Sequence, residues 1–179
     1  MSESILKKLD NYFLKLINEL PHPAWSDEIV LFLSWLGEAK ILLSAAAALG
    51  VIGLVLKKRK LWFGSLFLAL AILASAATVA VMKQIIDRPR PYEVFQDLYV
   101  ITRSESSSFP SGHAALFAAF GAFMALYFRR AKILWVVIIL IGGLARVYQG
   151  VHYPSDVLEG WIVAAVIGWA MSKIARSLT

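Results

Sequence analysis

The chain contains no cysteine, and only 17% of its residues are charged. The absence of cysteine excludes disulfide bonds and thiolate metal sites. A soluble domain has about 25% charged and about 45–50% apolar residues, whereas 59% of the residues here are hydrophobic. This composition predicts that a lipid bilayer, and not water, surrounds much of the protein.

Acidic residues are also scarce relative to basic ones, and the net charge is +6. On a soluble protein this charge would favour nucleic acid as a partner. In so apolar a chain, the expected partners are the lipid bilayer and a membrane lipid phosphate substrate, and no nucleic acid is expected. The length of 179 residues suits one domain, predicted as residues 1–179.

Residues 4–20 are predicted to form an amphipathic helix that Pro21 and Pro23 end. Charges are spread through this region, so no cleavable signal peptide is expected. Two interpretations stay open, namely a helix at the membrane surface and a helix packed on the rest of the protein. Its apolar residues recur at helical spacing, and they are Ile5, Leu6, Leu9, Phe13, Leu16, Ile17 and Leu20.

A transmembrane bundle is predicted within residues 29–179. A membrane-spanning helix needs about 20 mainly apolar residues, and residues 61–82 contain no charge at all. Residues 41–56 are slightly short, so this helix is expected to extend backward through Trp35 and Leu36. The other predicted spans are 114–128, 133–145 and 161–172, with a short sixth candidate in 24–36. The predicted fold is an all-α integral membrane bundle with about five to six transmembrane helices plus the N-terminal amphipathic helix.

Basic clusters give this bundle an orientation. They lie at 57–60, 129–132 and 173–176, which is the same membrane side if these spans are right. The positive-inside rule makes that side cytoplasmic. The loops 85–112 and 148–155 then face the periplasm or the cell exterior, in a multi-pass protein of the cytoplasmic (inner) membrane.

The first group of unusual polar residues contains Lys83 and Arg90. Pro89 disfavours helical geometry for Arg88, so the helix is expected to stop near Asp87. Arg90 would then lie on an extended segment that can fold back toward Lys83. Two fixed cations suit an oxyanion. The alternative is a pair of snorkelling charges beside a proline stop.

The second group is Pro110-Ser111-Gly112-His113, directly before an apolar segment. Ser111 suits a helix N-cap, and Gly112 lets a ligand approach the backbone closely. The free N–H groups and the dipole of such a helix terminus bind phosphate readily, and His113 would project at the same place. The alternative is an ordinary cap with a bystander histidine.

The third group contains Arg146, His152 and Asp156. Charges at membrane depth are costly and mark a function or a partner. A carboxylate beside an imidazole fixes its tautomer and stabilises its cation. Pro154 favours a turn that could bring Asp156 back to His152. The alternative is a structural ion pair between Arg146 and Asp156.

At these three groups the chain resembles the membrane lipid phosphatase branch of the type-2 phosphatidic acid phosphatase and vanadium haloperoxidase superfamily. The family signature is a lysine, six residues and Arg-Pro, followed by Pro-Ser-Gly-His, and then Ser-Arg, five residues, His, three residues and Asp. The order and internal spacing match between Lys83 and Asp156. One position departs, because Ala145 stands where the family usually has serine, which bears on fine tuning of the site.

The resemblance implies a role for each matching residue. His152 would be the nucleophile that forms a phosphohistidine, Asp156 would orient it, and His113 would protonate the leaving oxygen. The phosphoryl oxygens would be held by Lys83, Arg90, Ser111, Gly112 and Arg146. Side-chain cations would then do what Mg²⁺ does elsewhere, so no metal and no cofactor are expected.

The leading hypothesis is a metal-independent lipid phosphatase. The candidate substrates are undecaprenyl diphosphate, phosphatidic acid, phosphatidylglycerol phosphate and lipid A 1-phosphate. A lipid phosphotransferase that uses the same phosphohistidine is the second hypothesis. A non-catalytic lipid-binding or scaffolding protein is the third, and the presence of His113, His152 and Asp156 disfavours it. A haloperoxidase is disfavoured too, because those enzymes resemble large soluble proteins.

Overall fold

The computed structural model describes residues 4–179, and this part of the chain contains helices and no strand, as predicted for an all-α protein. Residues 1–3 of the predicted single domain lie outside the described residues. The helices are α1 (Ile5–Asn18), α2 (Ala24–Leu36), α3 (Ala39–Val55), α4 (Arg59–Ile86), α5 (Pro91–Val94), α6 (Gly112–Tyr127), the 3₁₀ helix η1 (Arg129–Ala131), α7 (Lys132–Tyr148) and α8 (Pro154–Ser177).

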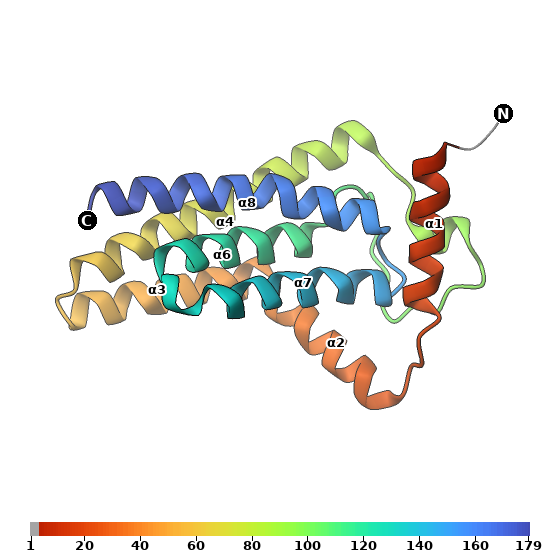
Figure 1. The fold of residues 1–179 in the computed structure, drawn as a ribbon, viewed down its shortest axis with the longest axis horizontal. Coiled ribbons are helices and arrows are strands. Elements are labelled where there is room, and N and C mark those ends of the chain that lie inside the picture. Colours follow the sequence, from red (N-terminus) through yellow and green to blue (C-terminus); the bar gives the residue numbers. More distant parts are fainter. Residues whose placement is uncertain (1–3) are drawn as a thin grey trace.

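Five long helices, α3, α4, α6, α7 and α8, lie side by side along the long axis of the molecule (Figure 1). Helix α6 packs against α4, α7 and α8. Small residues let α6 and α8 approach closely, as in other membrane bundles. A Cβ added at Gly160 of α8 would lie 2.7 Å from the Ser111 carbonyl oxygen, and one added at Gly168 would lie 2.5 Å from that of Ala119.

Three stretches of the described chain are long and apolar enough to cross a membrane, namely Arg59–Val94, Arg129–Tyr148 and Pro154–Ser177. Helices α2 and α3 pass the same test only as a pair, and α6 is apolar but shorter. A multi-pass membrane protein is therefore supported, and the number of five to six spans stays a prediction.

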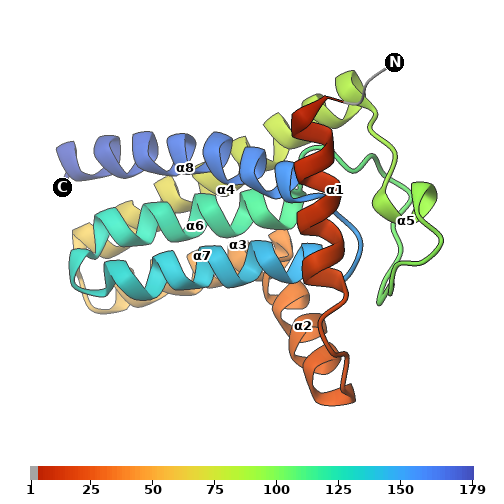
Figure 2. The same ribbon diagram turned by 45° about the vertical axis from the view of Figure 1, so that its right-hand side comes forward.

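The prediction of one continuous helix from Trp35 and Leu36 into residues 41–56 is wrong. Helix α2 ends at Leu36, α3 begins at Ala39, and the two axes differ by 60°. Glu38 has extended backbone angles at the break. Gly37 fits there because an added Cβ would lie 2.5 Å from the Phe117 ring. The bend turns α2 away from the bundle (Figures 1 and 2).

The predicted amphipathic N-terminal helix is confirmed as α1, which lies across the ends of α7 and α8 (Figure 2). Its inner face buries Asp10, Leu14 and Asn18. Its exposed apolar residues are Ile5, Leu6, Leu9, Phe13 and Leu16. The helix therefore packs on the rest of the protein, and its contact with a membrane surface stays a prediction.

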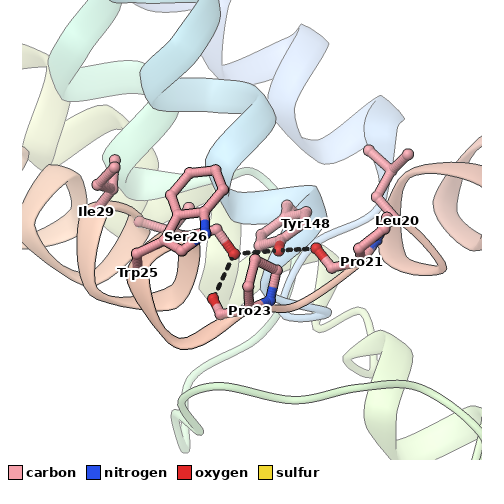
Figure 3. A pocket seen from close by; sticks show the side chains of 8 residues that line it. Leu20, Pro21, Pro23, Trp25, Ser26, Ile29 and Tyr148 are labelled. Carbon is pink, nitrogen blue, oxygen red and sulfur yellow. Dashed lines mark hydrogen bonds between the residues drawn. The ribbon is translucent and has the colours of Figure 1, made fainter.

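The segment between α1 and α2 forms a small apolar pocket of about 460 Å³ beside α7 (Figure 3). Tyr148 joins its two sides, since its hydroxyl donates to the Pro21 carbonyl at 2.7 Å and lies 2.9 Å from the Ser26 hydroxyl. The polar residues of the three sequence groups do not line this pocket. It is lined by Leu20, Pro21, Pro23, Trp25, Ser26, Ile29, Val30 and Tyr148.

Candidate active site

A larger cavity, of about 710 Å³, collects the three polar groups at one end of the bundle. Ser111 and Asp156 lie buried behind its wall, where the Ser111 amide donates to the Asp156 carbonyl at 2.9 Å. Residues far apart in the sequence therefore converge on one site. The predicted residues that line the cavity are Lys83, Arg90, Gly112, His113, Arg146 and His152.

His152 follows α7 and precedes α8, and only 2% of its surface is exposed. Its Nε2 lies 3.4 Å from Arg90 Nη1, while its Nδ1 faces Asp156 Oδ2 at 3.6 Å. The latter distance is too long for a hydrogen bond, but it is short enough for an ion pair once the imidazole is charged. Helix α8 begins at Pro154, so the expected turn does bring Asp156 back to His152.

The Asp156 carboxylate is completely buried and held from several sides. Its Oδ2 accepts hydrogen bonds from the Tyr153 amide at 2.9 Å and from the Ser108 hydroxyl at 2.5 Å. Its Oδ1 accepts one from Arg88 Nη1 at 2.6 Å. A buried charge needs such partners, because an unpaired one would cost several kcal/mol.

The first sequence group folds back as expected. Helix α4 ends at Ile86, where Asp87 takes a left-handed conformation, and Arg90 is extended. The Arg90 guanidinium donates to the Val151 carbonyl at 2.9 Å and to the Ser106 carbonyl at 2.7 Å. Lys83 Nζ donates to the Ser107 carbonyl. The loop thereby holds both cations at the cavity wall.

Arg146 does not form the alternative ion pair with Asp156. Its Nη1 donates to the Ser34 hydroxyl at 2.7 Å and to Gln149 Oε1 at 2.8 Å. Its Nε is buried and has no hydrogen-bond partner among the described residues 4–179. Buried donors are nearly always paired, so the unpaired N–H of an arginine that lines the cavity is a candidate donor to a ligand oxygen.

The second group forms the start of α6. Ser111 is the N-cap, and its hydroxyl accepts a long hydrogen bond of 3.5 Å from the Ala114 amide. A Cβ added at Gly112 would meet only Val79, at 3.8 Å. The backbone of the first turn is therefore open to the cavity, where His113 also lies. This geometry suits an anion at a helix N-terminus.

Sequence reasoning missed Arg88 and Ser108 as parts of this site. In the sequence, Arg88 stands out only as the residue before a proline, and Ser108 stands in a run of serines that is typical of a loop. The one local signal for Arg88 is that it is a second arginine, which stands two residues before Arg90 in the sequence. The contacts of both residues with Asp156 depend on the folded loop.

Histidine and acidic side chains do not gather into a metal site in residues 4–179, where no group of three or more could hold an ion. The cavity wall instead presents one acidic residue, Glu38, among several cations. Such a wall attracts oxyanions. The cations are Lys40, Lys83, Arg90, Arg103 and Arg146.

Comparison with known proteins gives consistent matches. The model of the PAP2 superfamily matches residues 64–179. A lipid A 1-phosphatase of Rhizobium johnstonii is 35% identical over 55% of this chain and 42% of its own length. An undecaprenyl-diphosphatase of Bacillus subtilis is 35% identical over 50% of this chain and 47% of its own. The chain thus spans less than half the length of these relatives.

A solved structure has the same fold. It is a transmembrane PAP2-type phosphatidylglycerolphosphate phosphatase from Bacillus subtilis, with a TM-score of 0.82 and 24% sequence identity. The match covers 99% of this chain and 89% of that one. At this identity the likeness shows the fold alone, and that fold is a membrane helical bundle.

Proposed function

Because the chain belongs to the PAP2 superfamily, we propose that it is a membrane lipid phosphatase that works through a phosphohistidine on His152. One observation carries the proposal, namely the cavity in which a buried histidine with a carboxylate behind it faces several fixed cations. The names of the relatives support a lipid phosphate as substrate.

The first step transfers the phosphoryl group to the enzyme. The lone pair of His152 Nε2 attacks phosphorus, since Nδ1 faces Asp156. The bond between phosphorus and the lipid oxygen breaks, and protonated His113 gives its proton to that oxygen. Asp156 stabilises the positive charge that forms on the imidazole.

The second step releases phosphate. Water attacks the phosphohistidine, His113 takes a proton from this water, and the bond between phosphorus and His152 breaks. Lys83, Arg90 and Arg146, with Ser111 and the Gly112 amide, hold the phosphoryl oxygens in both steps. This assignment rests on the cavity that Lys83, Arg90, Gly112 and Arg146 share, and on the need for charge stabilisation in phosphoryl transfer. Ser111 is included because it caps the helix that begins at Gly112.

The proposed location of the site is the periplasmic or outer face of the cytoplasmic membrane. The turns that carry the basic clusters at 57–60 and 129–132 lie at the end of the bundle opposite α1, together with the C-terminus (Figure 1). The site loops lie at the α1 end. Basic residues favour the cytoplasmic side, and this distribution supports the orientation.

The state of His152 gives a pH prediction. The pKa of His152 is lowered to about 3, because burial and then the nearby Arg146 and Arg90 lower it more than Asp156 raises it. A lowered pKa keeps the imidazole neutral above that value, so its lone pair is lost only in acid. We expect the ¹⁵N signals of His152 in detergent micelles to stay constant between about pH 5 and 8.

The plot of activity against pH is expected to be bell-shaped. By the same reasoning, a fall of activity in acid that is caused by protonation of His152 should appear only below about pH 5. The basic limb would report deprotonation of His113. Burial and then the nearby Arg146 lower the pKa of His113 to about 4, and the negative charge of a bound lipid phosphate would raise it again. A His152 signal, assigned from its loss in His152→Ala, that titrates near the ordinary value of about 6.5 would contradict this prediction.

The proposed function is tested by phosphate release from a panel of lipid phosphates in detergent with EDTA present. The panel contains undecaprenyl diphosphate, phosphatidic acid, phosphatidylglycerol phosphate and lipid A 1-phosphate, each with and without an acceptor lipid. We expect release from at least one lipid, and the preferred one names the substrate. Phosphate found on the acceptor instead of in solution would indicate a transferase. Release that requires Mg²⁺ would contradict the metal-independent mechanism.

A further inference from the structure

One guanidinium joins the catalytic carboxylate to helix α1. Arg88 Nη1 donates to Asp156 Oδ1 at 2.6 Å, and Arg88 Nη2 donates to Asp10 Oδ2 at 2.7 Å. The guanidinium also lies 3.8 Å from the centre of the Tyr153 ring. Arginine suits this place because its planar fork can bind two carboxylates at once.

Asp10 is itself a built part of this network. Only 7% of its side chain is exposed, although it belongs to a helix on the outside of the bundle. Its Oδ1 accepts from the Ser155 amide at 2.9 Å, and its Oδ2 accepts from the Ser155 hydroxyl at 2.6 Å. Ser155 stands in the first turn of α8, so Asp10 satisfies a free amide of that turn in the manner of an N-cap.

These contacts fix the orientation of the carboxylate behind His152. The Asp156 oxygen that faces His152 is Oδ2, and the oxygen held by Arg88 is Oδ1. Without Arg88, Oδ1 would be a buried and unpaired oxygen, and the carboxylate would rotate toward other donors. Arg88 is itself fixed, because its amide donates to the Ser107 hydroxyl at 3.0 Å.

We infer that Arg88 and Asp10 are positioning residues for the His152–Asp156 pair, and that α1 is therefore part of the frame of the active site. This inference rests on the proposed function. Neither residue lines the cavity, so both act through Asp156 and the start of α8. Their loss is expected to slow the chemical step while the phosphate-binding cations stay in place.

The test compares Asp10→Asn and Arg88→Gln with Asp97→Asn in the full-length protein. Asp97 is the matched control, because its carboxylate also holds α1, through an exposed ion pair of 2.7 Å with Lys15. We expect kcat to fall about 10- to 100-fold in Asp10→Asn and Arg88→Gln. KM and inhibition by inorganic phosphate, the product, should not change. Asp97→Asn should keep the wild-type kcat.

Two further variants separate positioning from a general loss of structure. Arg88→Lys should recover only part of kcat, because an ammonium lacks the planar fork. The double variant Asp10→Asn with Arg88→Gln should be scarcely slower than Arg88→Gln, since residues of one network are not additive. Additive losses would overturn the inference, and so would a weaker affinity for inorganic phosphate.

The failure of this inference is distinct from that of the proposed function. If wild type releases no phosphate from any lipid, the proposed function fails. If wild type is active and Arg88→Gln keeps its kcat, the positioning role is overturned and the phosphatase stands. An equal fall of kcat in Asp97→Asn would show that α1 acts through general docking and not through Asp10.

Discussion

Replacement of His152 with alanine is expected to lower kcat by roughly 10⁴-fold or more, the scale seen when a covalent nucleophile is removed. The variant has no nitrogen to attack phosphorus, so no phosphoenzyme can form. The first measurement is phosphate release in detergent from the preferred lipid. The second is a rapid quench in base with ³²P-labelled lipid, because a phosphohistidine is labile in acid. The label should stay on wild type and be absent from His152→Ala.

The control for this prediction is His22→Gln, which changes a histidine outside the cavity. His22 lies between the rings of Tyr99 and Tyr148, at 3.9 and 4.2 Å between centroids. It should keep both the turnover and the labelled intermediate. If His152→Ala retained label or turned over near the wild-type rate, another residue would be the nucleophile.

The second large effect is expected for Arg146→Gln, which should lower kcat/KM by about 10³-fold. A donor that stabilises transferred or developing charge is worth roughly 10²- to 10³-fold, and an arginine in phosphoryl transfer can be worth more. Ser34 and Gln149 fix the Arg146 guanidinium, and its buried Nε has no hydrogen-bond partner in the part of the chain that the structure describes. The substitution removes this donor and a charge from the cavity together.

Arg103→Gln is the matched control, because Arg103 lines the same cavity but is exposed and lies over the Tyr92 ring at 5.4 Å. An exposed cation is screened by water and salt, so its loss should cost less than about 10-fold. Thermal unfolding in detergent must be compared for both variants. If both variants stayed folded and lost kcat/KM equally, the result would contradict the phosphate-binding role proposed for the buried Arg146.

Several local features could be predicted because they depend on neighbours in the sequence. The proline after Arg88 ends α4 near Asp87, and Ser111 caps α6. Both effects act over a few residues. The apolar segments likewise predicted the long helices. Their order then placed Lys83, His113 and His152, which lie in or beside the two loops, at one end of the bundle, where the cavity collects them.

Other features could not be predicted, because a partner far along the chain decides them. The sequence offers Arg146 as an ion-pair partner of Asp156, yet Arg88 is the arginine that reaches it. Asp10 meets Arg88 across 78 positions of the sequence. The bend at Gly37 also depends on a distant ring, that of Phe117.

The sequence by itself determined the membrane class, most of the helical segments and the set of candidate site residues. These follow from composition, local backbone preference and motif spacing, which act within a few turns of chain. Only the tertiary structure decided which cation pairs with Asp156 and that α1 closes the back of the site through Asp10. A buried charge must find a partner wherever packing leaves one within reach, and that choice belongs to the folded chain.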